Sequence, residues 1–157
     1  MRSKVANLGV FNLMRTITLG FNLAFKKTDM ACPRRLEWIT NILRSITPNQ
    51  PVEYVNLFIN DLVPSTGWIE QITQFPWSLF EDLFCSHLQW PTLLGINIGF
   101  AAREGREIEP RDWVLLGKCL RAKLSSLSDK GILRLHLPGL SNCAFFDDFQ
   151  SPMRLRN

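Results

Sequence analysis

Residues 51–62, PVEYVNLFINDL, decide the fold because they fit two patterns at once. The β-branched and aromatic side chains favour a strand. Against this, the apolar side chains recur mostly at three- and four-residue steps, as on one face of a helix: Val52, Val55, Phe58, Ile59 and Leu62. The leading Pro51 also favours a helix, since proline fits the first helical turn, where its missing N–H costs nothing. We therefore predict a helix here and keep a strand as the alternative.

Prolines mark the start of similar segments on both sides of this stretch. Each stands just ahead of an apolar run with helical spacing: Pro33, Pro51, Pro64, Pro76, Pro91 and Pro110. The strongest helical pattern follows Pro110. Residues 83–102 contain no Asp, Glu, Lys or Arg, but Pro91, His87 and Asn97 argue for a buried central helix and against a membrane span. The predicted fold is all-α, a compact bundle of five to seven short Pro-initiated helices.

Composition sets the class and the organisation of the chain. Its 157 residues correspond to about one domain, and 46% hydrophobic with 20% charged residues is ordinary for a soluble globular chain. We assign residues 30–131 to the helical domain, with Gly131 as a helix C-terminal cap. The segments do not share a consensus, so we predict no internal repeat.

The N-terminal segment, residues 1–29, has a different character. Its first acid is Asp29, and its basic residues are interspersed with apolar ones. Three interpretations stay open: a mitochondrial-type targeting presequence, a membrane-interfacial helix, or an ordinary first helix or strand pair of the fold.

The C-terminal residues 132–157 form an extended or irregular tail in this prediction. Leu133, Leu135 and Leu137 alternate with Arg134 and His136, which indicates one short strand or an extended segment on the bundle. A lone strand needs a partner, and the other candidate lies near the N-terminus.

No pattern in the chain predicts catalysis, a metal or a cofactor. Cys85 and His87 are the only close Cys/His pair, whereas a zinc site needs about four ligands, commonly in paired short spacings. Gly95 and Gly99 lack a P-loop lysine. The scattered cysteines show no disulfide framework, and no secretory leader is evident, so we expect an intracellular, reducing compartment. We predict a non-enzyme without cofactor.

The function that remains is binding to another macromolecule, for which we favour a protein. Five Trp are many for so small a core, and Trp and Arg are preferred interface anchors. The predicted partner-binding residues are Arg34, Arg35, Trp38, Trp68, Trp77, Trp90, Arg111 and Trp113.

Two alternatives come from other classes. The first is a membrane-associated or organelle-targeted accessory protein led by residues 1–29. The second is a basic helical module that binds nucleic acid, suggested by the net charge of +4. The second alternative requires one shared face for six basic residues: Arg34, Arg35, Arg44, Arg111, Arg121 and Lys123.

Overall fold

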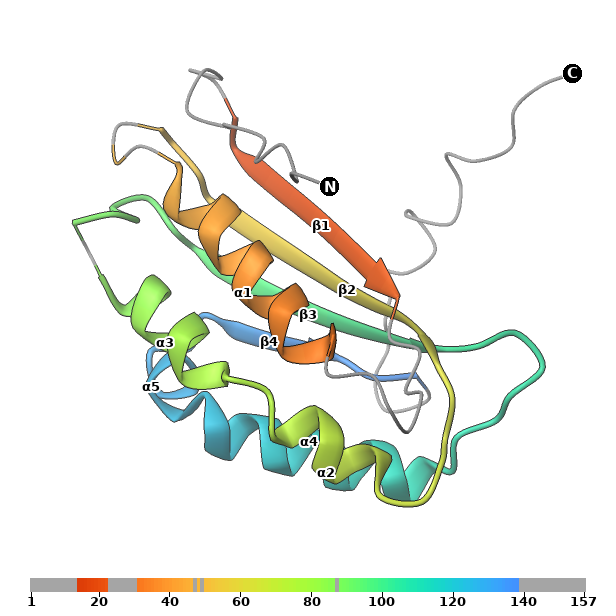
Figure 1. Ribbon diagram of the computed structural model, residues 1–157. Coiled ribbons are helices and arrows are strands. Elements are labelled where there is room, and N and C mark those ends of the chain that lie inside the picture. Colours follow the sequence, from red (N-terminus) through yellow and green to blue (C-terminus); the bar gives the residue numbers. More distant parts are fainter. Residues whose placement is uncertain (1–13, 23–30, 47, 49, 87, 139–157) are drawn as a thin grey trace, which may run out of the picture.

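The computed structural model describes residues 14–22, 31–46, 48, 50–86 and 88–138 (Figure 1). Four strands form one sheet, every neighbouring pair is parallel, and the order in the sheet is the order in the chain. The prediction of an all-α helical bundle is therefore wrong, and the fold is α/β. The strands are β1 (Thr16–Asn22), β2 (Tyr54–Leu62), β3 (Gly95–Ala102) and β4 (Leu133–His136).

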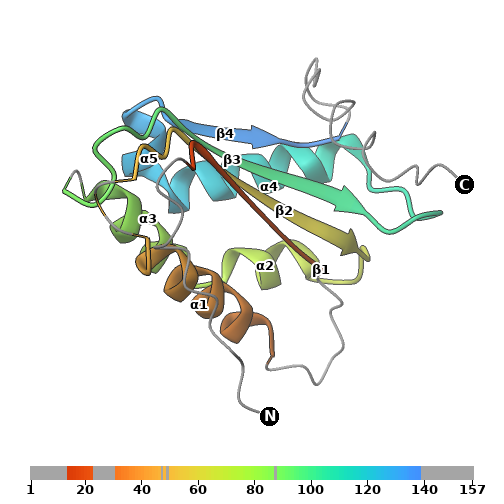
Figure 2. The same cartoon turned by 90° about the horizontal axis from the view of Figure 1, so that it is seen from above.

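Helices fill every connection between these strands. Figure 2 shows all five on the same face of the sheet. Connections between parallel strands have one preferred hand, so a strand order that never reverses places each connection on the same side. The helices are α1 (Ala31–Arg44) after β1, α2 (Trp68–Thr73) and α3 (Trp77–Cys85) after β2, and α4 (Pro110–Lys123) and α5 (Ser125–Asp129) after β3.

The helix predicted for residues 51–62 is the strand β2 because a second periodicity prevails. Val55, Leu57 and Ile59 alternate toward the helix layer and are fully buried. The run after Pro91 behaves likewise, and Ile96 and Ile98 of β3 are also fully buried. Strands at the centre of a sheet bury such an alternating set against helices, and that burial outweighs the weaker helical spacing.

The six prolines that precede the apolar segments therefore fall into two groups, those that precede or begin a helix and those that precede a strand. Pro110 is the first residue of α4, and Pro76 is the N-cap of α3. Pro33 lies in the first turn of α1, and Pro64 lies four residues ahead of α2. Pro51 and Pro91 instead precede β2 and β3. Both uses exploit the same property, since proline ends the preceding element and donates no backbone hydrogen bond.

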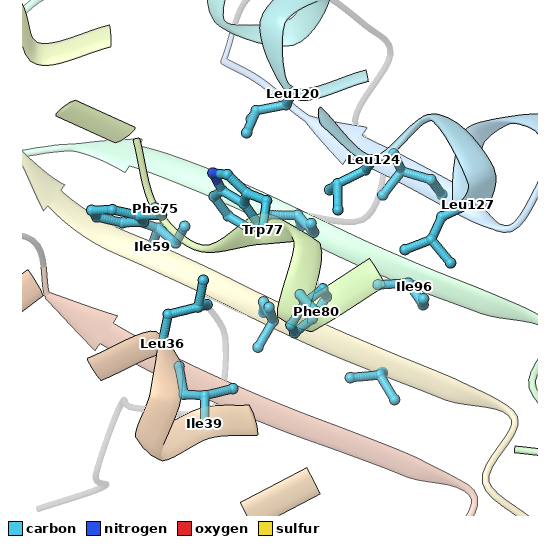
Figure 3. Close-up of a cluster of buried hydrophobic side chains, with 14 of the residues drawn as sticks. Leu36, Ile39, Ile59, Phe75, Trp77, Phe80, Ile96, Leu120, Leu124 and Leu127 are labelled. Carbon is cyan, nitrogen blue, oxygen red and sulfur yellow. The ribbon is translucent and has the colours of Figure 1, made fainter. Parts of the chain in front are cut away.

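The core lies between the sheet and the helix layer (Figure 3). Trp77 is its largest fully buried side chain, and its indole Nε1 donates to the Ile72 carbonyl at 2.8 Å. Aromatic rings continue the core along and beyond α3 with centroid distances of 4.7 to 6.3 Å: Phe75, Trp77, Phe80, Phe84 and Trp90. A single helix layer over a four-stranded sheet thus makes a broad core that holds most of the tryptophan.

Both outer segments of the chain contribute to the sheet. The short strand predicted around residues 133–137 is confirmed as β4, but its partner is β3 and not an N-terminal strand. Part of the segment 1–29 forms β1, which pairs with β2. The remaining parts of the two ends, residues 1–13, 23–30 and 139–157, lie outside the described residues.

Candidate functional site

One face of the sheet carries no helix among the described elements (Figure 2). We call it the helix-free face. All-parallel sheets are ordinarily covered on both faces, so this surface is the most unusual feature of the fold. Alternation along the strands assigns to it a set of polar and aromatic side chains: Thr16, Thr18, Tyr54, Asn56, Phe58, Asn60, Asn97, Arg134 and His136.

A row of hydrogen bonds crosses this face through all four strands. Asn56 Nδ2 donates to Thr18 Oγ1 at 3.2 Å, and Asn97 Nδ2 donates to Asn56 Oδ1 at 2.7 Å. His136 Nε2 lies 3.3 Å from Asn97 Oδ1. Because that amide oxygen can only accept, the contact requires the imidazole proton on Nε2. We call Thr18, Asn56, Asn97 and His136 the polar row. Each hydrogen bond in the row is donated by the strand farther from β1 to the strand nearer to it.

The centre of the polar row is closed to solvent. Asn56 and Asn97 are each only 3% exposed. A buried amide without a hydrogen-bond partner is costly, whereas a satisfied chain of hydrogen bonds in a low dielectric reinforces itself. The two amides therefore hold neighbouring strands in one alignment. A one-residue slip of β3 would turn Asn97 into the apolar core and Ile98 out of it.

The polar row also reveals a repeat that the sequence hides. Successive members are 38, 41 and 39 residues apart along the chain. Each unit is one strand followed by its helices, as in solenoid proteins that stack similar units side by side. The sequence segments do not share a consensus, and each unit carries different helices and loops.

Aromatic side chains lie beside the polar row where β3 carries glycine. A Cβ built on Gly95 would meet the Tyr54 ring at 3.2 Å, so the ring lies close over the β3 backbone. Phe58 lies four residues further along β2 than Tyr54, in register with Gly20 and Gly99. Small residues on β1 and β3 thereby leave room for the large rings of β2.

The imidazole at the end of the polar row is half-buried. Burial is the main cause that lowers the pKa of His136, and the nearby charge of Arg134 lowers this pKa further. The fold therefore favours the neutral imidazole.

Most of the predicted tryptophan anchors are not on the surface. Trp77 is 1% exposed, and Trp68 and Trp113 pack edge-to-face at 5.8 Å between α2 and α4. Trp90 is buried against Phe84. These four side chains belong to the core and have no surface to offer a partner. Trp38, 44% exposed on α1, is the one tryptophan with a substantial accessible surface in the described part of the chain.

The predicted basic anchors are dispersed. Arg111 is exposed and pairs with Glu109 at 2.7 Å. Arg44 ends α1 and Arg121 lies on α4; both helices lie on the same face of the sheet, but α1 lies toward the β1 edge and α4 toward the β4 edge (Figure 2). The side chains of Arg34 and Arg35 lie outside the description. The described members of the proposed nucleic-acid set do not form one patch.

An ion pair ties the charged loop after β3 back to β2. Arg103 donates two hydrogen bonds to Asp61, at 2.6 and 2.7 Å. The Arg103 hydrogen bond holds the pKa of Asp61 below its ordinary value. Asp61 has φ 63, uncommon for a residue other than glycine, and the β2–β3 register shifts between Ile59 and Leu62. This pair fixes the end of the strand and places no group for acid–base chemistry.

Comparison with known proteins finds no match from which a function could be inferred. No protein-family model, curated protein or solved structure matches the chain. Within the described ranges, no group of three or more His, Cys, Asp or Glu side chains could hold a metal ion. None of the described helices combines the length and the apolarity needed to cross a bilayer.

Replacing Asn97 tests the polar row directly. Asn97→Ala should lower the free energy of unfolding by about 1–3 kcal/mol, because it strips the donor from Asn56 Oδ1 and the acceptor from His136. The control is Asn60→Ala, which removes a half-buried amide from the same face of β2 and should cost only about 0.5 kcal/mol. Equal losses in urea titrations of both variants would contradict the row.

The lowered pKa of His136 predicts a pH dependence of stability. A depressed pKa means that the unfolded chain binds the proton more readily, so stability is fully present above the unfolded pKa of about 6.5. It falls as the pH drops from there toward the folded pKa. His136→Gln should flatten this fall in the free energy of unfolding. Since the variant and the parent protein both contain His87, the difference between their pH profiles reports on His136 alone. An unchanged pH profile would show that His136 titrates alike in both states.

Proposed function

We propose that this protein is a non-enzymatic interaction module that binds another protein through the helix-free face. The observation that carries the proposal is a parallel sheet with helices on one face only and an ordered row of polar side chains on the other. Stacked-repeat proteins use extended surfaces of this kind for binding.

The strand order also argues against the usual ligand site of α/β enzymes. In open α/β sheets, small ligands bind at the carboxyl ends of the strands, where the strand order reverses and helices change sides. Among the four described strands the order never reverses. The described sheet thus lacks the crevice that such a reversal opens, and its broad helix-free face is the better candidate surface.

The chemistry of the face suits a protein partner. Thr16 and Thr18 are exposed, and Tyr54 and Asn60 are half-buried beside them. Aromatic rings supply contact area in interfaces, and polar groups held in place beforehand form hydrogen bonds at a small entropic cost. Such a surface does not need the tryptophan anchors that the sequence suggested.

Site-specific crosslinking tests the proposal. The photoreactive residue p-benzoylphenylalanine is placed at Thr16 on the helix-free face or, as a matched control, at Ser125, a small polar position exposed on α5. We expect a discrete protein adduct from Thr16 in cell extract and none of the same mass from Ser125. Thr16→Arg should abolish co-purification of that protein, whereas Ser125→Arg should not.

The same experiment has outcomes that contradict the proposal. Identical adducts from both positions would indicate non-specific contact. Adducts to nucleic acid alone would favour a nucleic-acid-binding module, and adducts to lipid alone would favour a membrane-associated protein. Absence of any adduct from Thr16 in the full chain would remove the helix-free face as the binding surface.

A further inference from the structure

A groove of about 520 Å³ runs along the outer edge of the sheet, between β4 and α4. β4 is the edge strand opposite β1 (Figure 1). This groove lies mainly on the helix side of the edge and contains no member of the polar row, and Arg134 is the residue that it shares with the helix-free face.

The groove has an apolar wall built by alternate residues of the last strand. Leu133, Leu135 and Leu137 form one side, and Val114 of α4 forms part of the other. Gly117 of α4 lets the two sides meet, since a Cβ there would lie only 2.8 Å from a Leu137 methyl. Val114 is 38% exposed and leaves an apolar surface open to a partner.

Three basic side chains line the same groove. Lys118 and Arg121 lie three residues apart on α4, and Arg134 extends from β4. All three are exposed, and no carboxylate of the described residues lines the groove or pairs with them. The groove therefore combines an apolar wall with a positive charge that no described carboxylate neutralises.

The backbone of β4 also presents hydrogen-bonding groups to this side. Ile96 N donates to the Ile132 carbonyl, so Ile132, Arg134 and His136 direct their peptide groups toward β3. The alternation of a parallel ladder then directs the peptide groups of Leu133 and Leu135 outward. No described strand pairs with that edge.

We propose that this groove binds an extended acidic peptide segment of another protein, which adds to the edge of β4 as a fifth strand. The main chain of the peptide pairs with Leu133 and Leu135. Because every second side chain of a strand points to the same face, the carboxylates that meet Lys118 and Arg121 and the apolar side chains that pack on the wall share one set of alternate positions in the peptide. Strand addition to an open sheet edge is an established mode of peptide recognition. A nucleic acid would satisfy the cations but neither the strand edge nor the leucine wall.

The probe is a synthetic fluorescent peptide of about seven residues that carries Glu and Leu or Val at every second position, on one strand face, and Thr between them, titrated against the full chain by fluorescence anisotropy. A second peptide carries Lys in place of Glu, and a third carries N-methyl groups on alternate amides of the pairing edge. We expect saturable binding of the acidic peptide alone, with the N-methylated peptide at least about tenfold weaker because it cannot complete the ladder.

Paired charge reversals separate the groove from the general basic charge of the protein. Lys118→Glu with Arg121→Glu should weaken binding at least about tenfold. Lys123→Glu with Lys130→Glu makes the same charge change at exposed positions outside the groove and should weaken it less than about twofold. All four positions are exposed, so both variants should keep the parent circular dichroism spectrum and melting temperature. Neither pair touches the polar row, so the helix-free face can fail or succeed independently.

Several results would overturn the proposal. These are no saturable binding of the acidic peptide, equal binding of the N-methylated peptide, and equal effects of the two charge reversals. Tighter groove-dependent binding of a single-stranded RNA oligonucleotide would assign the cations to nucleic acid. Self-association of the chain that only the Lys118→Glu, Arg121→Glu variant dissolves would assign the groove to a second copy.

Discussion

The hand of the connections between parallel strands is the constraint on which the rest of this structure depends. Each strand lies beside its predecessor, so every connection returns on the same side and the helices form one layer. One consequence is a broad core that holds Trp68, Trp77, Trp90 and Trp113. The other consequence is a sheet face that no described helix covers. The two surfaces proposed for binding, the helix-free face and the groove at β4, both follow from this arrangement.

The polar row gives the helix-free face a defined structure. Asn56 and Asn97 would be destabilising as isolated buried amides, but each satisfies the next, and Thr18 and His136 end the row at the two edge strands. The row penalises a slipped register, which the leucine and isoleucine pattern on the other side penalises independently. The hydrogen bonds of the polar row on one face and the burial of apolar side chains on the other thus favour the same alignment of strands.

The sequence predicts some of these elements correctly for clear physical reasons. The helix after Pro110 has the strongest helical pattern, and it is α4; the alternation at residues 133–137 is β4. At β2 the sequence is ambiguous, because Val55 and Ile59 belong both to the alternating strand pattern and to the helical stripe, and only the neighbouring strands decide between the two. The polar row could not be found from spacing alone: its members are 38 to 41 residues apart and meet only through the register.

Nuclear Overhauser contacts between backbone protons of the isotope-labelled chain test directly whether the four strands form a parallel sheet in sequential order. This sheet predicts cross-strand contacts between Asn56 and Asn97 and between Thr18 and Asn56, together with strand-type Hα shifts through residues 54–62 and 95–102. It predicts no contact between β1 and β3, which β2 separates. Unbroken sequential amide–amide contacts through residues 54–62 and 95–102, the signature of helices, would contradict it.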